Sequence, residues 1–259
     1  TNTPPGAPSS VYCLRDVRKK REKGGISFEL QVPELDIFPG EFVAILGPSG
    51  CGKSTLLDLL ALVLSPGRAQ TFALGLPGPQ GMQVIEPLGL TDAHLANIRR
   101  QYMGYVLQSG GLLPFLSVKD NILLSCRMNG LDGLPEDGDN LVRRLGIASQ
   151  LLKKPKHLSA GQRQRAAIAR ALSHRPPIVL ADEPTASVDS VNAREVVHTF
   201  QTLTREMQVS LVMVTHDQGL VQDIADRVLT FQVHRQSERE TRAILREEHG
   251  SRSGYALQG

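Results

Sequence analysis

The sequence predicts an α/β fold built on a mostly parallel sheet. Three apolar runs, at 42–46, 178–181 and 210–215, have the length and near-continuous hydrophobicity of strands buried on both faces. Helix-length segments follow the first run and separate the second from the third. A glycine-rich loop joins the first run to its helix, which gives the strand–loop–helix order of half a βαβ unit.

The composition is that of a globular protein able to bury its own core. The chain has 259 residues, of which 41% are hydrophobic and 21% charged. The net charge of 29 − 26 = +3 is too small to indicate a protein that coats nucleic acid. Three cysteines, Cys13, Cys51 and Cys126, lack the spacing of a zinc site or a disulfide framework, so we expect three free thiols.

No segment has the pattern of a membrane span or a targeting signal. The most apolar stretch, 56–64, is interrupted by Asp58 and is much shorter than the roughly 20 residues needed to cross a bilayer. Residues 1–6 lack a charged region followed by an apolar one, so we expect no signal peptide and a location in the cytoplasm.

The remaining elements are predicted from the spacing of apolar residues and from Gly-, Pro- and polar-rich stretches. Residues 1–10 are mostly Pro, Gly, Ser and Thr, which predicts a flexible leader, and the polar residues 234–259 predict a solvated helix or a frayed tail. The Pro- and Gly-rich stretch 65–91 predicts loops and short strands. Further strands are expected at Val11–Val17 and Ile26–Val32, and helices at 53–64, 92–101 with Asp92 as N-cap, 140–145, 161–173 and 192–207.

The loop at 47–55 has the pattern of a phosphate-binding loop. Its residues match G-x-x-x-x-G-K-[ST] between a strand and a helix, the context that such a loop requires. Glycines let backbone N–H groups and the positive end of the helix face phosphate oxygens, Lys53 would pair with the β- and γ-phosphates, and Ser54 would hold Mg²⁺. An ordinary glycine-rich turn is the alternative. The predicted nucleotide contacts are Gly47, Pro48, Ser49, Gly50, Cys51, Gly52, Lys53, Ser54 and Thr55.

Two adjacent carboxylates end the strand at 178–181. A buried strand has no structural use for Asp182 and Glu183 at its carboxyl end, where ligands bind in open α/β sheets. We predict that Asp182 holds Mg²⁺ through water and that Glu183 polarises the attacking water. A solvated strand end or a helix cap is the alternative.

Two more polar side chains follow apolar strands in the same way. His216 follows the strand at 210–215, where it could sense the γ-phosphate, although a lone histidine is often structural. Gln108 follows the apolar stretch 103–107 and could join the shell of Mg²⁺ and water. We assign catalytic roles to Glu183, His216 and Gln108, and Mg²⁺ binding to Ser54, Gln108 and Asp182.

The set of motifs resembles an ATP-binding-cassette (ABC) ATPase from Val11 to about Phe231. The phosphate loop, Gln108, the stretch Leu158–Gln162, the Asp182–Glu183 pair, Ser187–Asp189 and His216 occur in the family's order. The resemblance implies a P-loop NTPase (RecA-like) core at 11–233, with an N-terminal antiparallel β subdomain and a helical subdomain inserted at about 92–172. It also implies ATP and Mg²⁺ as cofactors.

The resemblance implies that two copies share each nucleotide. Ser159, Gly161 and Gln162 precede a helix whose N-terminus attracts phosphate, and in this family that phosphate is bound by the other copy. Asp189 is implied at the same junction. Read alone, Leu158–Gln162 is only a helix cap.

Shorter matches at 103–108, 112–122 and 225–228 are similar to the lipoprotein-release and macrolide-exporter type of ATPase (LolD-like and MacB-like). The resemblance implies an ATPase that is peripheral on the cytoplasmic face of the cell or inner membrane and drives an integral membrane subunit. The surface between Gln108 and Asn129 would then receive that subunit, although the leucines at 112–116 could equally belong to the core. No nucleic acid is expected as a partner.

Three features depart from the family pattern. Arg21 stands where a tyrosine usually stacks on adenine, so Arg21, Phe28 or Tyr12 would have to provide the base platform, with reduced selectivity for the base. Ala160 stands where the family usually has a glycine, and the segment 65–91 is longer than the pair of strands that the family usually has there.

Two other functions stay open at this point. A non-transport ABC ATPase acting on nucleic acid or ribosomes is disfavoured by the single cassette and by the shortness of the basic runs 18–21 and 153–156. A scaffold that binds ATP without hydrolysis is disfavoured by the intact Asp182–Glu183 pair.

Overall fold

A computed structural model describes residues 10–79, 81–135, 138–237 and 239–248. The predicted leader at 1–10 therefore lies outside the described residues, except for the buried Ser10. The strands are β1 (Tyr12–Lys23), β2 (Ile26–Ile37), β3 (Phe42–Leu46), β4 (Thr71–Gly78), β5 (Gly81–Ile85), β6 (Met103–Val106), β7 (Ile178–Asp182), β8 (Ser210–Thr215), β9 (Arg227–Ser237) and β10 (Glu240–Glu247). The helices are α1 (Lys53–Leu60), α2 (Asp92–Tyr102), α3 (Val118–Met128), α4 (Gly138–Arg144), α5 (Ala160–Leu172) and α6 (Ser190–Glu206), with short 3₁₀ turns at Ala148–Gln150, Pro155–His157 and Gln218–Leu220.

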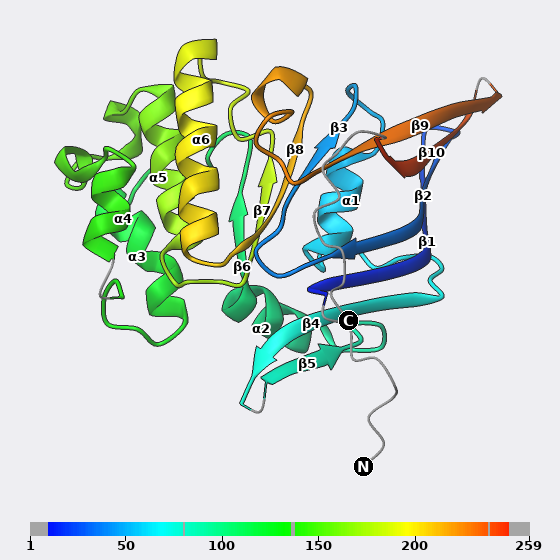
Figure 1. Cartoon of the computed structure of the whole chain (residues 1–259), viewed down its shortest axis with the longest axis horizontal. Helices are drawn as coiled ribbons and strands as arrows, with labels where there is room; N and C mark the ends of the chain where they lie inside the picture. The colour runs from blue at the N-terminus through cyan, green and yellow to red at the C-terminus, as the bar shows by residue number, and fades with distance from the viewer. Residues whose placement is uncertain (1–9, 80, 136–137, 238, 249–259) are drawn as a thin grey trace.

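All ten described strands belong to one sheet, which confirms the predicted α/β class. Their order is β5-β4-β1-β2-β10-β9-β3-β8-β7-β6. Strands β9, β3, β8, β7 and β6 run parallel to one another, whereas β1 pairs antiparallel with both β2 and β4 (Figure 1). The predicted parallel core and N-terminal antiparallel part are therefore present.

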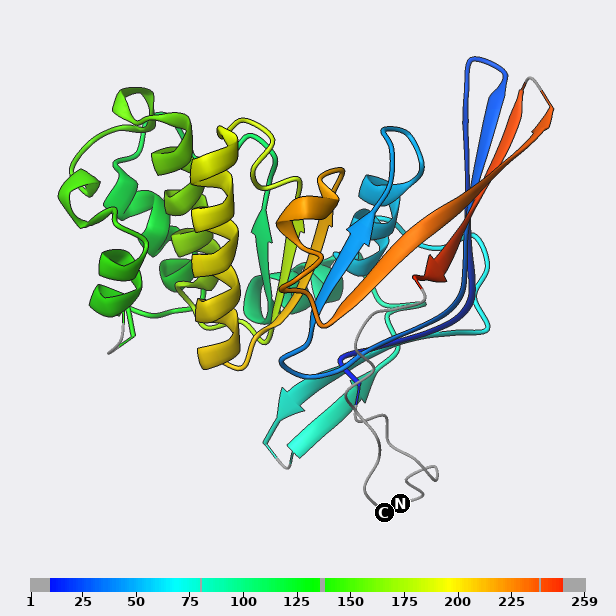
Figure 2. The same cartoon turned by 45° about the horizontal axis from the view of Figure 1, so that its top comes forward.

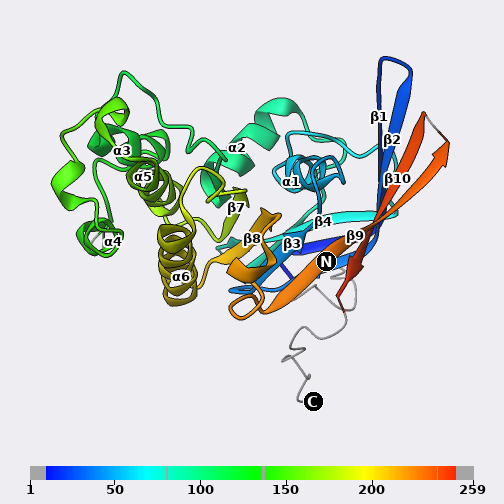
Figure 3. The same ribbon diagram turned by 90° about the horizontal axis from the view of Figure 1, so that it is seen from above.

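Alternate side chains of the parallel strands supply two separate cores. Val43 and Ile45 of β3 pack in a core with α1, whereas Phe42, Ala44 and Leu46 pack in a second core with α5 and α6. Seen from above, α1 and α2 lie on one side of the strands and α5 and α6 on the other (Figure 3). This double burial explains why the strands are continuous apolar runs.

Part of the segment 92–172, which is predicted as a helical insertion, packs with the sheet and α1. Helix α2 contributes Ile98 to the same core as α1, and β6 pairs with β7 in the sheet. Helices α3 and α4 gather beyond the β6 edge, and α5, which packs on the sheet, lies between them and α6 (Figure 1).

Helix ends differ from prediction by small amounts with local causes. Helix α1 ends at Leu60, because Leu62 adopts a left-handed φ of 57°. The N-cap of α2 is Thr91 rather than Asp92, since the Thr91 side chain accepts from the His94 amide. Strands β4 and β5 form a hairpin within the irregular region 65–91, at the edge of the sheet.

The predicted solvated helix or frayed tail after His234 was wrong for the residues that are described there. Residues 234–237 continue β9, and β10 pairs with both β9 and β2. Ala243 and Leu245 of β10 are buried at alternate positions, and the charged residues Arg242 and Arg246 flank this short apolar stretch. Those flanking charges hid the alternation in the sequence. Residues 249–259 of the predicted tail lie outside the described part.

Hairpins β1–β2 and β9–β10 run side by side as a long arm of the sheet (Figure 2). The Ser27 amide donates to the Arg239 carbonyl at 2.7 Å, which joins the two hairpins near their tips. Within the described ranges, no helix combines the length and apolar character of a membrane span. Cys13, Cys51 and Cys126 are free thiols, as predicted.

Candidate functional site

The register of the parallel strands brings the predicted site segments to one edge of the sheet. Leu46 lies opposite Thr215, Asp182 opposite Val214, and Val106 opposite Ala181. The segments that follow these positions begin at Gly47, Glu183, His216 and Leu107, so all four leave the sheet on the same side.

The loop after β3 closes around the Lys53 ammonium group. Lys53 is only 6% exposed, and its Nζ donates to the Gly47 carbonyl at 2.7 Å and to the Pro48 carbonyl at 3.1 Å. Gly52 caps α1 with a φ of 108°, a conformation that side chains rarely adopt. A Cβ at Gly52 would also lie 2.9 Å from the ring of Phe28, so a side chain here would both strain the backbone and displace that ring.

Glu183 links the loop to the end of β8. Its Oε1 lies 3.4 Å from Lys53 Nζ and its Oε2 lies 3.0 Å from His216 Nδ1. The Glu183 amide donates to the Val214 carbonyl at 3.0 Å, and its φ is 43°, the left-handed region. Backbone strain of this kind, costing on the order of 1–3 kcal/mol, is concentrated at functional sites. The strained turn points the Glu183 carboxylate toward the loop, and this side chain is only 17% exposed.

Asp182 and Ser54 form an oxygen-rich pair beside Glu183. Burial raises the pKa of Asp182, and a hydrogen bond with the Ser54 side chain opposes that rise. The neighbouring Glu183 charge raises the pKa of Asp182 further. A hydroxyl and a carboxyl group held together are hard oxygen donors, the kind that Mg²⁺ prefers in proteins.

A cavity of about 390 Å³ lies over the loop. Arg21 and Phe28, which face each other across β1 and β2, line it together with Glu183 and with residues 49, 50 and 52–55 of the loop. The predicted contacts Gly47, Pro48 and Cys51 are not among the described lining residues, and Cys51 is buried. Arg21 Nη1 donates to Thr55 Oγ1 at 3.4 Å. Tyr12, by contrast, is fully buried and its hydroxyl donates to the Leu60 carbonyl at 2.9 Å. Tyr12 is therefore excluded as a base platform.

Other predicted contacts lie apart from this cavity. Ser159 caps α5 through a reciprocal pair of hydrogen bonds with Gln162, and Asp189 caps α6 by accepting from the Asn192 amide. The described residues that line the cavity include neither of these caps, nor Gly161. Gln108 is exposed just beyond β6, and it too is outside the cavity lining.

The predicted surface between Gln108 and Asn129 separates into core and exposed residues. Leu112 packs partly against the helical core, whereas Phe115 is 68% exposed. Asn121 is fully buried and holds the segment between them, because it bonds both the amide and the carbonyl of Leu113.

Sequence reasoning missed Leu152. This side chain is 88% exposed, and the segment on which it lies is bonded to the start of α3, since the Lys153 carbonyl accepts from the Val118 amide at 2.8 Å. Leu152 and Phe115 therefore flank the same junction. The only signal in the sequence was an apolar residue beside a basic run at 153–156.

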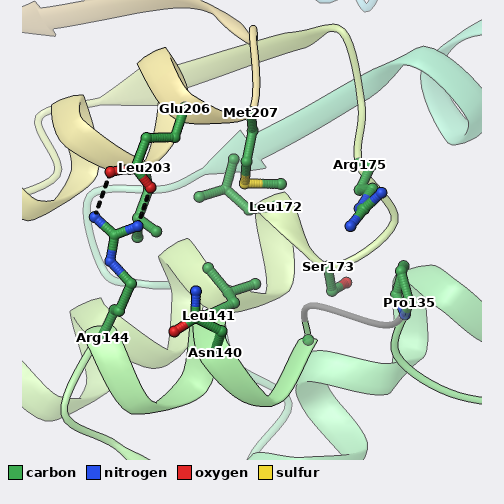
Figure 4. A pocket seen from close by; sticks show the side chains of 11 residues that line it. Pro135, Asn140, Leu141, Arg144, Leu172, Ser173, Arg175, Leu203, Glu206 and Met207 are labelled. Carbon is green, nitrogen blue, oxygen red and sulfur yellow. Dashed lines mark hydrogen bonds and ion pairs between the residues drawn. The ribbon is translucent and has the colours of Figure 1, made fainter.

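A second cavity, about 130 Å³, lies between α4 and the carboxyl ends of α5 and α6. Leu141, Leu172, Leu203 and Met207 give it apolar walls, and an Arg144–Glu206 ion pair closes one side (Figure 4). It is one-third the size of the cavity over the phosphate loop, and it contains none of the predicted site residues.

Comparisons of the sequence with known proteins agree with one another. The family model described as "ABC transporter" matches residues 30–186. The chain is 39% identical over 198 residues to the uncharacterised ABC transporter ATP-binding protein YvcR of Bacillus subtilis, covering 75% of this chain and 73% of that protein. It is 38% identical to the lipoprotein-releasing system ATP-binding protein LolD of Legionella pneumophila, covering 76% of this chain and 84% of that protein.

Solved structures agree as well. The dimeric structure of MJ0796, a bacterial ABC transporter cassette, has a TM-score of 0.72 and 30% identity, covering 85% of this chain and 93% of that chain. A dimeric post-hydrolysis state of MJ0796 bound to ADP and Pi has a TM-score of 0.71 and 28% identity, covering 94% and 100%.

Proposed function

This chain belongs to the ABC transporter family, and from that premise we propose that it hydrolyses ATP with Glu183 as the base and thereby drives an integral membrane partner. The observation that carries the assignment is the Glu183 carboxylate, which lies between Lys53 Nζ at 3.4 Å and His216 Nδ1 at 3.0 Å. The chain is an ATP-hydrolysing subunit of a transporter; the residue roles below are proposals.

The phosphate chain of ATP would occupy the loop around Lys53. Backbone N–H groups of residues 47–55 and the N-terminus of α1 supply positive potential for phosphate oxygens. The Lys53 ammonium, now bonded to the Gly47 and Pro48 carbonyls, would turn to the β- and γ-phosphates. The base would lie along Arg21 and Phe28, which line the same cavity.

Ser54 and Asp182 would hold Mg²⁺, and Gln108 would complete its shell. The hydrogen-bonded hydroxyl and carboxyl pair fits the oxygen preference of this ion. When bound, Mg²⁺ would neutralise charge on the phosphate oxygens. Gln108 is exposed beyond the β6 edge, so it would move inward to reach the shell.

Glu183 would accept the proton of the attacking water. The strained φ of 43° directs the Glu183 carboxylate toward the loop. The contact between Oε2 and His216 fixes the carboxylate, so that Oε1 is oriented to accept the proton. His216 would also contact the γ-phosphate and so report its presence to the end of β8. Positioning and electrostatics of this kind supply most of the catalysis of phosphoryl transfer.

A second copy would complete each site. Ser159, Gly161 and Gln162 lie at an exposed helix N-terminus that lines no part of this copy's own cavity. An N-terminus of this kind attracts phosphate, so it would meet the nucleotide of the partner copy. Asp189 would lie at the same junction. The relatives solved as dimers support this arrangement.

Phe115 and Leu152 would form the surface that receives the membrane subunit. Both are exposed, at 68% and 88%, and both flank the junction where the Val118 amide meets the Lys153 carbonyl. Exposed apolar side chains gathered at one junction are typical of an interaction site. The chain would then be peripheral on the cytoplasmic face of the membrane.

The transport role is favoured over action on nucleic acid. The relatives are named as transporter ATP-binding proteins, among them LolD and macrolide export proteins. The basic run at 18–21 is also engaged locally, because Arg18 pairs with Asp16 and Lys20 pairs with Glu22. These pairs neutralise two of the four cations in that run.

The test is a pull-down of tagged Glu183→Gln protein, with ATP and Mg²⁺, from detergent-solubilised membranes of the source cell. Recovery of one multi-span membrane protein with a large extracytoplasmic domain supports the transport role and the lipoprotein-release type. Recovery of ribosomal or nucleic-acid-binding proteins without a membrane subunit would contradict it.

A further inference from the structure

A half-buried arginine of α5 holds the loop that carries Gln108. Arg170 Nη1 donates to the Gly111 carbonyl at 2.7 Å, and Nη2 donates to the Gly110 carbonyl at 3.2 Å. Burial lowers the pKa of Arg170, and among the described residues no carboxylate pairs with it. The charge is therefore compensated by these two carbonyl groups, and its position depends on the loop.

The loop lies directly on α5. Gly110 and Gly111 have left-handed φ values of 75° and 59°. A Cβ at Gly110 would lie 3.6 Å from the Ala167 Cβ and 3.6 Å from Gln164 Oε1. Positions 164, 167 and 170 are three residues apart, so they share one face of the helix. The loop that carries Gln108 packs on that face.

The same helix begins at the Ser159 cap. Helix α5 is 13 residues long, and its first turn is fixed by the reciprocal bonds between Ser159 and Gln162. The N-terminus of α5 is therefore the proposed contact to the phosphate bound by the partner copy. The side of the same helix holds the loop that carries Gln108. Residues 166–169 of α5 are all buried, so the middle of the helix is enclosed on every side and the continuous helix links these two features.

We propose that Arg170 is a positioning residue that fixes the loop 107–111 to α5, so that Gln108 and the Ser159 end of the helix approach their nucleotides together. This inference rests on the proposed function. Neither Arg170 nor the two glycines it bonds is among the described residues that line the nucleotide cavity, so its loss should slow the chemical step and leave ATP binding to the cavity nearly unchanged.

The test is steady-state ATP hydrolysis by the full chain carrying Arg170→Met. The kcat should fall roughly 10- to 100-fold, the range expected for a displaced catalytic group, while the KM for ATP changes less than about twofold. Arg170→Lys keeps the charge but cannot fork to both carbonyls, so it should recover only part of the kcat. Arg143→Met is the matched control, because Arg143 is an exposed helical arginine bonded to its own helix.

A variant on the loop side keeps the inference testable if Arg170→Met fails to fold. Gly110→Ala meets ordinary contact distances and opposes only the left-handed backbone, so it should lower kcat in the same way. The two substitutions combined should lose less than the product of their separate effects, because they break one contact. If the kcat loss of the double variant equals the product of the two single losses, or if folded Arg170→Met has the parent's kcat, the inference is overturned while the proposed function stands. A parent that hydrolyses no ATP would overturn the proposed function as well.

Discussion

Glu183 Oε2 lies 3.0 Å from His216 Nδ1, across the ends of the neighbouring strands β7 and β8. The other oxygen of the same carboxylate lies 3.4 Å from Lys53 Nζ, on the helix that follows β3. One side chain therefore connects three segments that are far apart in the chain. Its backbone is held in a left-handed conformation by the Val214 carbonyl, so the carboxylate is positioned by the sheet rather than by its own rotamer alone.

Replacement of Glu183 by Gln should abolish steady-state ATP hydrolysis while ATP binding persists. The amide keeps the shape and the contact with His216 but cannot accept the proton of the attacking water. We expect at least about a 100-fold loss of kcat and an ATP-dependent dimer on size-exclusion chromatography. Glu86→Gln, at an exposed position outside the cavity, is the control. Turnover at the parent rate by Glu183→Gln would show that another group is the base.

ATP and GTP should bind with comparable affinity. Arg21 and Phe28 line the cavity and are the proposed base platform, and a guanidinium or phenyl face stacks on either purine without reading its edge. We expect dissociation constants within about threefold, measured by calorimetry on Glu183→Gln protein, because stacking tolerates every base. Phe28→Ala should weaken both nucleotides alike. A strong preference for ATP would contradict this assignment.

Tyr12→Phe separates the two aromatic candidates for the platform. Tyr12 is fully buried and its hydroxyl donates to the Leu60 carbonyl. Removal of the hydroxyl should lower the free energy of unfolding by about 1 kcal/mol without a change in nucleotide affinity. Chemical unfolding and calorimetry measure the two quantities. A weaker nucleotide affinity in a folded Tyr12→Phe would argue against the buried role.

Phe115→Asp and Leu152→Asp should each reduce recovery of the membrane subunit in the pull-down. A carboxylate at an apolar contact loses its hydration on docking, so we expect at least about a tenfold loss of captured partner. Leu88→Asp is a matched control, because Leu88 is 47% exposed near the β4–β5 hairpin, in a different part of the chain. Equal recovery with all three variants would place the docking surface elsewhere.

The stability of the protein should fall as the pH falls from about 6.5 to 4, in part through His174. Burial lowers the pKa of His174 from 6.5 to about 4 and outweighs an opposing backbone contribution from Met103. Because the folded pKa lies below the unfolded one, the unfolded state binds more protons in this window, and the free energy of unfolding rises with pH across it. The contribution is on the order of 2 kcal/mol.

Denaturant unfolding at pH 7 and pH 4.5 checks this contribution. His174→Gln should lose less stability on acidification than the parent, whereas His198→Gln, at an exposed position on α6, should behave like the parent. An unchanged pH dependence in His174→Gln would remove His174 as the cause.

Much of the fold could be predicted because local pattern and burial agree in the centre of the sheet. Strands β3, β7 and β8 are buried on both faces, so their sequences are continuous apolar runs bounded by glycine or charge. Strand β10 was missed because only Ala243 and Leu245 of its eight residues are buried, in a segment that begins and ends with exposed charged residues. Its partners, β2 and β9, are identified only by the tertiary pairing.

The site divides in the same way. The sequence predicts Lys53, Asp182, Glu183 and His216 as the groups that bind phosphate and move a proton, because they lie at or just beyond the ends of apolar strands and parallel strands end at one edge. It could not determine that Glu183 contacts both Lys53 and His216, that Tyr12 is buried away from the cavity, or that Leu152 lies beside the start of α3. Those relationships depend on strand order, register and a strained φ, which arise from contacts between residues distant in the chain and leave no periodic signal within any one segment.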